Sequence, residues 1–102
     1  MDAFHALADP TRRRIIERLA AGERTAGEIA ESFSISGPAV SQHLKVLRTS
    51  GLVSVRAEAQ RRIYRLEAPA LAAVDAWLAR VRSYWSPRLD ELERKLRDER
   101  DQ

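Results

Sequence analysis

The stretch that decides the fold runs from residue 25 to residue 51 and reads TAGEIAESFSISGPAVSQHLKVLRTSG. Thr25 stands three residues before Glu28, which is the pattern of a capping box at the start of a helix. Ser36 is a favourable N-cap for a second helix, and Gly51 can take the left-handed conformation that ends one. These signals predict two capped helices joined by a tight turn. Such a helix-turn-helix makes double-stranded DNA the expected partner.

The second of these helices is predicted to have one face that packs and one that is free. The apolar side chains at helical spacing on the packing face are Val40, Leu44 and Leu47. On the free face, Gln42 can pair with adenine and Lys45 can reach guanine or a phosphate. The candidate DNA-contacting residues of this helix are Ser36, Pro38, Ala39, Ser41, Gln42, His43 and Lys45. For Ser36 a capping role, and for His43 a structural role, is an equal alternative.

An alternating apolar pattern follows Gly51 and predicts a β-hairpin, with strands over residues 52–56 and 62–66 and a loop over 57–61. A hairpin directly after a recognition helix is a wing. The arginines that could reach phosphates or the minor groove from it are Arg56, Arg61 and Arg62.

Basic charge is concentrated in the same part of the chain. Residues 1–35 carry five basic and six acidic side chains, residues 36–66 carry six and one, and residues 67–102 carry seven and eight. The middle segment alone therefore accounts for the positive net charge. A basic segment that includes a presented helix is typical of a surface that binds a phosphate backbone.

Helices are also predicted before and after the helix-turn-helix and its wing. A short one over residues 3–8 precedes a helix capped by Asp9, and a long one extends from Pro69 to Arg97. The long helix carries an apolar seam that needs a partner, and Pro87 is expected to kink or break it. The candidate dimer-interface residues are Phe4, Leu7, Leu71, Val74, Leu78, Val81 and Trp85. The alternative is that the seam folds back on its own domain.

The chain is thus predicted to be mainly α with a small β-hairpin and to form a single winged helix-turn-helix domain over residues 1–102. Within this domain, residues 69–97 are predicted to form a dimerisation helix and residues 98–102 a polar tail. The chain has no cysteine, no basic and apolar leader at its start and no long apolar run, so we expect a cytoplasmic protein outside the membrane. No converging nucleophile, base or carboxylate pair is recognisable, which argues against an enzyme.

These elements, in this order, closely resemble the ArsR family of bacterial repressors. The matching stretches are ALADPTRRRI (6–15), PAVSQHLKVLR (38–48), GLV (51–53) and RRIYRL (61–66). The resemblance implies a homodimer joined by the first and last helices, with each recognition helix in a major groove and each wing at the backbone. The chain departs from the family's frequent residues at Gly37, where Gln is common, and at Ala59, where the wing turn often has Gly.

Many members of that family sense metals through clustered Cys, His or Asp ligands. This chain has no Cys, and no His in either of the helices that carry such ligands, so we expect no metal site, no cofactor and a place in the metal-independent branch with its autorepressors. A small-molecule effector site between the last helices could be lined by Trp77, Tyr84 and Trp85. Aromatic residues at helical spacing are more often core or dimer contacts, which is the alternative interpretation. The function expected is a repressor that binds an inverted repeat as a homodimer; the alternative is a winged helix used for protein contact.

Overall fold

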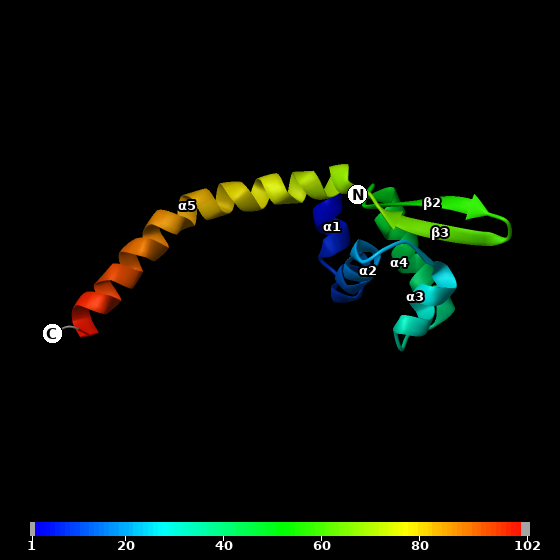
Figure 1. The fold of residues 1–102 in the computed structure, drawn as a ribbon, viewed down its shortest axis with the longest axis horizontal. Coiled ribbons are helices and arrows are strands. Elements are labelled where there is room, and N and C mark those ends of the chain that lie inside the picture. Colours follow the sequence, from blue (N-terminus) through cyan, green and yellow to red (C-terminus); the bar gives the residue numbers. More distant parts are fainter. Residues whose placement is uncertain (1, 101–102) are drawn as a thin grey trace.

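The computed structural model describes residues 2–100, and it shows a small body from which one long helix projects (Figure 1). In chain order the elements are α1 (Ala3–Leu7), α2 (Pro10–Ala20), β1 (Arg24–Thr25), α3 (Ala26–Ser32), α4 (Gly37–Thr49), β2 (Val53–Glu58), β3 (Arg61–Leu66) and α5 (Ala68–Arg100). The wing formed by β2 and β3 lies at the opposite end of the molecule from the end of α5. The predicted fold class, mainly α with a small hairpin in a winged helix-turn-helix, is confirmed.

The helix ends of the helix-turn-helix lie close to where the local signals predict them. Thr25 and Glu28 make both bonds of the capping box, with Thr25 N–H donating to Glu28 Oε1 at 3.0 Å and Glu28 N–H donating to Thr25 Oγ1 at 3.2 Å. Ser36 caps α4 through its hydroxyl, which accepts from Ala39 N–H at 3.3 Å. Gly51 has a φ of 81°, the left-handed conformation expected just past the helix end.

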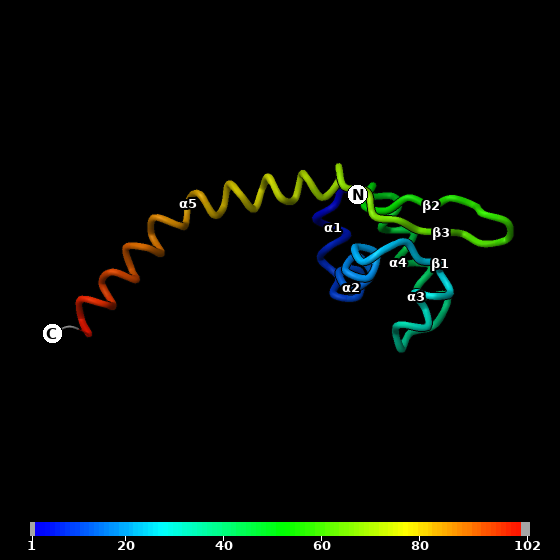
Figure 2. Tube along the Cα trace, viewed as in Figure 1, coloured from blue at the N-terminus to red at the C-terminus, as the bar shows by residue number. Residues whose placement is uncertain are grey.

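The sheet has three antiparallel strands in the order β1-β3-β2 (Figure 2). Glu58 is paired with Arg61, so the two long strands are joined by only two residues, and the loop predicted over residues 57–61 is wrong by three residues. Ala59, the first of those two, has a φ of 57°, which is rare for a residue with a Cβ. The two-residue strand β1, which pairs Thr25 with Ile63, was not predicted.

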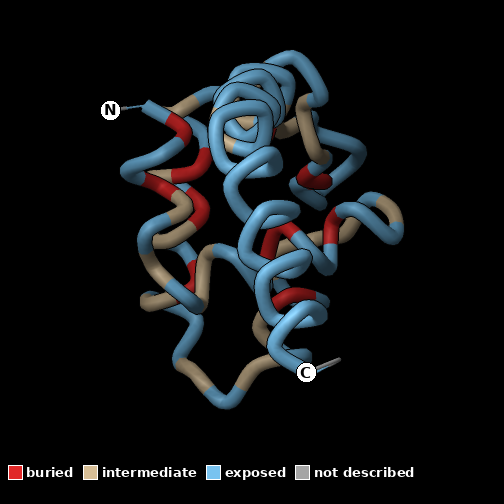
Figure 3. Tube along the Cα trace, turned by 90° about the vertical axis from the view of Figure 1, so that its left-hand side faces the viewer, coloured by how far each residue is buried: buried red, intermediate tan, exposed pale blue. Residues whose placement is uncertain are grey.

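The core lies where α1, α2, α3 and α4 meet the base of the sheet, and the buried segments are confined to that body (Figure 3). The large side chains buried most completely are Ile15, Ile29, Val40, Leu44, Leu47 and Leu52. Three of these come from α4. The recognition helix is therefore held rigidly by its apolar face.

Helix α5 runs unbroken for 33 residues, about 50 Å, through Pro87. The sequence predicted a kink or a break at Pro87; no break occurs there, and the helix instead bends gradually along its length (Figure 1). Because this part of α5 is exposed, water can bond the carbonyl that lacks a donor at Pro87, and a gradual bend can accommodate the ring. The helix also includes residues 98–100 of the predicted polar tail, whereas 101–102 lie outside the described residues.

Candidate nucleic-acid interface

Helix α4 presents a polar face to solvent directly opposite the face that it buries. Val40, Leu44 and Leu47 are at most 1% exposed. Pro38, Ser41, Gln42 and Lys45 are all exposed, and Ala39 is half-buried. Gln42 and Lys45 stand three residues apart on one side of the helix, so they can enter one groove together.

Two of the predicted recognition-helix residues have partners inside the protein. The hydroxyl of Ser36 is used as the N-cap described above. His43 is turned toward the start of α2, where its Nδ1 lies 3.3 Å from Arg12 Nη1 and 3.9 Å from Asp9 Oδ2. The structure therefore gives both residues local structural roles.

The three wing arginines fall into two groups. Arg61 and Arg62 are exposed at the start of β3, next to the turn. Arg56 instead pairs with the Glu23 carboxylate at 2.7 Å and with Glu58 at 3.4 Å, and the bond to Glu23 raises the pKa of its guanidinium. Arg56 is thus partly neutralised by acidic side chains, while Arg61 and Arg62 form none of the ion pairs seen in residues 2–100.

Sequence reasoning missed Arg48 and Thr49, which line a shallow hollow with Lys45 along the exposed side of α4. Arg48 stands three residues after Lys45, and this helical spacing could have shown that it continues the same face. Among residues 2–100, no ion pair involves Lys45 or Arg48. The candidate interface accordingly carries four basic side chains without an acidic partner there, two on α4 and two on the wing.

The candidate dimer-interface residues are divided between the body and the solvent. Leu7, Leu71 and Val74 pack against the protein's own core, so the first part of the seam folds back on its own domain. Phe4 makes an edge-to-face contact with Trp77, and both residues remain a little under half exposed. Farther along, Leu78 and Trp85 are exposed by 41% and 49%, and Val81 is half-buried.

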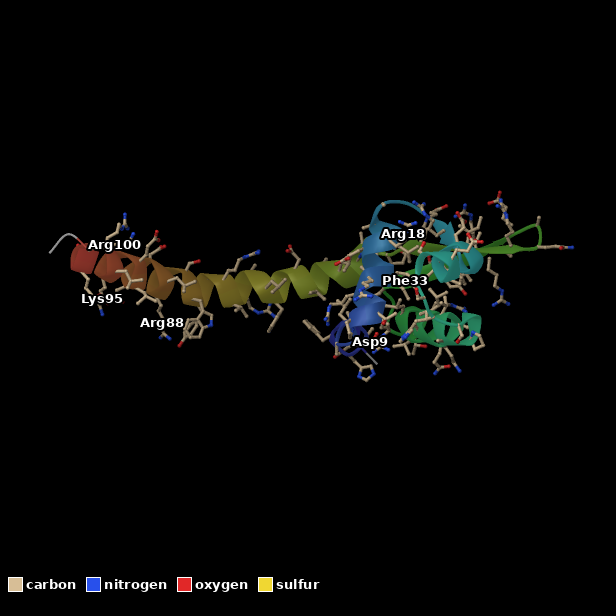
Figure 4. All side chains as sticks on the ribbon, turned by 90° about the horizontal axis from the view of Figure 1, so that it is seen from below. Asp9, Arg18, Phe33, Arg88, Lys95 and Arg100 are labelled. Atoms are coloured by element: carbon tan, nitrogen blue, oxygen red, sulfur yellow. The ribbon has the colours of Figure 1, made fainter. Side chains whose placement is uncertain are left out.

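The second half of α5 extends away from the body with its side chains in solvent (Figure 4). Arg88 lies over the Tyr84 ring, 4.2 Å from its centre, and Tyr84 packs edge to face on Trp85. The remaining exposed apolar residues of this half are Leu89, Leu92 and Leu96.

Within residues 2–100, no helix combines the length and the apolar character needed to cross a membrane. Within the same residues, no cluster of three or more His, Asp or Glu side chains is arranged to hold a metal ion.

Comparison with known proteins connects this geometry to a family. Residues 9–55 match the model of the bacterial regulatory proteins of the arsR family. The chain is 50% identical over 84 residues to the HTH-type transcriptional regulator Rv2034 of Mycobacterium tuberculosis, covering 82% of this chain and 76% of that protein. It is 39% identical over 77 residues to the transcriptional repressor SdpR of Bacillus subtilis, covering 76% and 86% of the two chains.

A solved structure agrees with this assignment. The crystal structure of the ArsR family transcriptional regulator RHA00566 superposes with a TM-score of 0.73 at 36% identity, over 81% of this chain and 86% of that one. The family and these relatives are transcription regulators and not enzymes. A match of this extent, on a chain whose helix-turn-helix and wing have the expected geometry, shows that the protein belongs to the ArsR family of bacterial regulatory proteins.

Proposed function

We propose that this protein is a transcriptional repressor that binds an inverted repeat in duplex DNA as a homodimer. The observation that carries the proposal is the two-sided character of α4: a fully buried face fixes the helix to the body, and the opposite face presents Gln42 and Lys45 to solvent. A glutamine amide can bond both N6 and N7 of adenine in the major groove. In the major groove, α4 would therefore distinguish one base sequence from another.

Arg48 on α4, and Arg61 and Arg62 on the wing, add exposed positive charge to that reading face. Contacts from such side chains to phosphates position a protein on DNA without selecting a sequence. A protein-binding wing is better served by an apolar surface, because interfaces between proteins are depleted of charge at their centres. The exposed arginines of this wing therefore favour DNA over a protein partner.

The test is selection of bound duplexes from a random pool, with Gln42→Ala compared against wild type. We expect the variant to lose preference at one base position per half-site, at a cost of about 1–3 kcal/mol for each bidentate pair. Gln60→Ala is the matched control, because Gln60 is an exposed glutamine in the wing turn. A consensus that is identical for wild type and Gln42→Ala would contradict the proposed base contact.

The apolar seam of α5 supports a second copy of the chain as its partner. Three pairs of its apolar positions are placed symmetrically about a midpoint between residues 81 and 82. In an antiparallel pair of α5 helices centred there, the facing pairs would be Leu71 with Leu92, Val74 with Leu89, and Leu78 with Trp85. Asp75 would face Arg88, which places opposite charges beside the seam.

This arrangement would also cover what the monomer leaves exposed. Leu89 and Leu92 of one chain would meet Val74 and Leu71 of the other, which already lie at the edge of the partner's core. A two-fold dimer of this kind presents two recognition helices, and helices about 34 Å apart read half-sites one turn of DNA apart.

Because the chain lacks cysteine, introduced cysteines can test this pairing directly. The double variant Val74→Cys with Leu89→Cys is expected to form covalent dimers on oxidation. Either change alone is expected to give none, because the two copies of position 89 would be about 22 Å apart in the antiparallel pair. Efficient crosslinking of Leu89→Cys alone would indicate parallel helices, and a monomeric wild type by light scattering would reject the dimer.

We also propose that DNA binding does not depend on a metal. The chain has only two histidines and no cysteine, and one of the histidines, His43, already contacts Arg12 and Asp9. Titration of zinc or arsenite into a binding assay should leave the affinity unchanged. A metal-dependent change in affinity that is abolished by His5→Ala would contradict this part of the proposal.

A further inference from the structure

We propose that Arg12 is a positioning residue that ties the recognition helix α4 to α1 and thereby sets the distance between the two recognition helices of the dimer. The inference rests on the proposed function, because it concerns how two half-sites are read together. It adds a residue that lies outside the recognition helix and the wing.

One side chain joins three helices at this point. Arg12 belongs to the first turn of α2, and its Nε donates to Ala6 O in α1 at 2.6 Å. Its Nη2 donates to His5 O, also in α1, at 3.4 Å, and its Nη1 lies 3.3 Å from His43 Nδ1 in α4. Asp9, at the start of α2, is labelled in Figure 4 where these helices converge.

Helix α1 depends on such contacts. It has only five residues, far fewer than an isolated helix needs for stability, and of its last three carbonyls only His5 O accepts a backbone N–H within residues 2–100, from Ala8 at 3.2 Å. Arg12 supplies a donor to Ala6 O and a second, longer bond to His5 O. The position of α1, which carries Phe4 into the proposed dimer interface, is therefore linked to the guanidinium of Arg12.

The same guanidinium constrains α4. Its nitrogens only donate, so His43 must accept through Nδ1 in this contact. The planar guanidinium holds its donors in a fixed fork, and a rotation of α4 relative to α1 would break a bond at one end. His43 is adjacent to Gln42 in the sequence, so a change in its position would also move the proposed base-reading side chain.

Asp9 is a third member of the group formed by Arg12 and His43, and it fixes the backbone of Arg12. Asp9 Oδ2 accepts the Arg12 backbone N–H at 2.9 Å and lies 3.9 Å from His43 Nδ1. The side chains of His43 and Asp9 are only 22% and 31% exposed. His43 therefore contributes to DNA reading through its hold on α4.

Arg13 provides a matched control. Its Nη1 donates to Leu7 O at 2.8 Å and to Ala8 O at 3.2 Å, so it also anchors the end of α1. Within residues 2–100, its side chain makes no hydrogen bond to α4. Arg13→Met removes the same charge and the same kind of anchor as Arg12→Met, but it leaves the link to α4 intact.

The experiment uses the half-site that wild type selects from random DNA, built into inverted repeats whose centre spacing varies by single base pairs. Affinity for each spacing is measured for wild type, Arg12→Met and Arg13→Met, together with dimer mass. We expect wild type to prefer one spacing sharply. Arg12→Met should lose about tenfold affinity at that spacing and show a flatter profile at unchanged dimer mass, whereas Arg13→Met should keep the wild-type profile.

Substitutions of His43, the partner of Arg12 in α4, distinguish a positioning role of His43 from a direct contact between His43 and DNA. His43→Leu should reproduce the flattened profile, and the double variant with Arg12→Met should be no worse than either single one. His43→Asn, which keeps an acceptor near the position of Nδ1, should restore the wild-type profile. Additive losses in the double variant would overturn the proposal.

An unchanged spacing profile in Arg12→Met would overturn it as well, and so would equal flattening in Arg13→Met. If Arg12→Met does not fold, Arg12→Lys takes its place with the same expectation, because one ammonium group cannot reproduce the fork that spans α1 and His43. If wild type selects no duplex sequence at all, the proposed function fails before any spacing is measured.

Discussion

The guanidinium of Arg56 lies 2.7 Å from the carboxylate of Glu23, across the central strand of the sheet. Arg56 belongs to the outer strand β2, and Glu23 immediately precedes the other outer strand, β1. The pair fastens the wing to the body. It also places a negative charge beside an arginine that the sequence predicts to contact the DNA backbone.

Glu23→Gln should therefore strengthen binding to duplexes of any sequence at low salt. Arg56 would lose the closer of its two carboxylate partners and keep only the longer pair with Glu58 at 3.4 Å, which leaves it more available to a phosphate. The plot of log affinity against log salt should therefore steepen by up to about one unit. Glu91→Gln is the control, because Glu91 is an exposed acid paired with Lys95 on α5 and carries the same charge. A slope that stays at the wild-type value in Glu23→Gln would mean that Arg56 does not reach DNA when it is free.

Arg61→Ala and Arg62→Ala should weaken all duplexes alike. Each removes an exposed charge beside the wing turn, so each should reduce the salt slope by about one while the selected base preference stays the same. Arg65→Ala, in the same strand but bonded to Glu67 at 3.1 Å, should have a smaller effect. Binding at several salt concentrations measures all three. Loss of base preference in Arg61→Ala or Arg62→Ala would instead assign sequence reading to the wing.

Ala59→Gly should stabilise the protein. The left-handed conformation costs a residue with a Cβ about 1–2 kcal/mol, and the greater freedom of glycine in the unfolded chain offsets part of the gain, so the net effect should be under about 1 kcal/mol. Ala57→Gly, two residues earlier within β2, should destabilise instead, because a strand interior disfavours glycine. Urea unfolding at one fixed protein concentration compares the midpoints. A lower midpoint for Ala59→Gly would show that the turn does not strain this residue.

Asp9→Asn should lower stability only where the carboxylate is charged. The Arg12 backbone N–H, with help from the positive charge of the Arg12 guanidinium, holds the pKa of Asp9 below its usual 3.8 in the folded protein. Its charged form therefore stabilises the folded state above pH 3.8, and this contribution is lost as the pH falls through the lower, folded value.

The free energy of unfolding of wild type should thus exceed that of Asp9→Asn by up to about 1 kcal/mol near neutral pH, and the difference should disappear in acid. Denaturant unfolding of both proteins across the acidic range measures it. A difference that is the same at every pH would assign the effect of Asp9 to cap geometry alone.

Local signals in the sequence were sufficient to predict the helix-turn-helix. The capping box of Thr25 and Glu28, the cap at Ser36 and the glycine at position 51 act on neighbouring backbone groups, so their effect does not depend on the rest of the fold. The spacing of Val40, Leu44 and Leu47 likewise predicted which face of α4 is buried, because a helix places such residues on one side wherever it lies.

Features that depend on pairing between distant residues were not predicted. Strand β1 exists because Thr25 meets Ile63, and the two-residue turn at Ala59 follows from the register that pairs Glu58 with Arg61. Neither feature has a local signal: β1 is too short for an alternating pattern, and the turn lacks a glycine.

What the sequence by itself determined is the set of helices and the hairpin, the presented face of α4 and the basic character of the segment around it, since these depend on propensity, periodicity and composition. The tertiary structure alone decided which charges are free. Arg56 is held by Glu23, and Arg12 contacts His43, although the members of each pair lie far apart in the chain. Ionic and hydrogen-bonding partners are set by distance in space, and only the packing of the helices on the sheet brings these groups within reach.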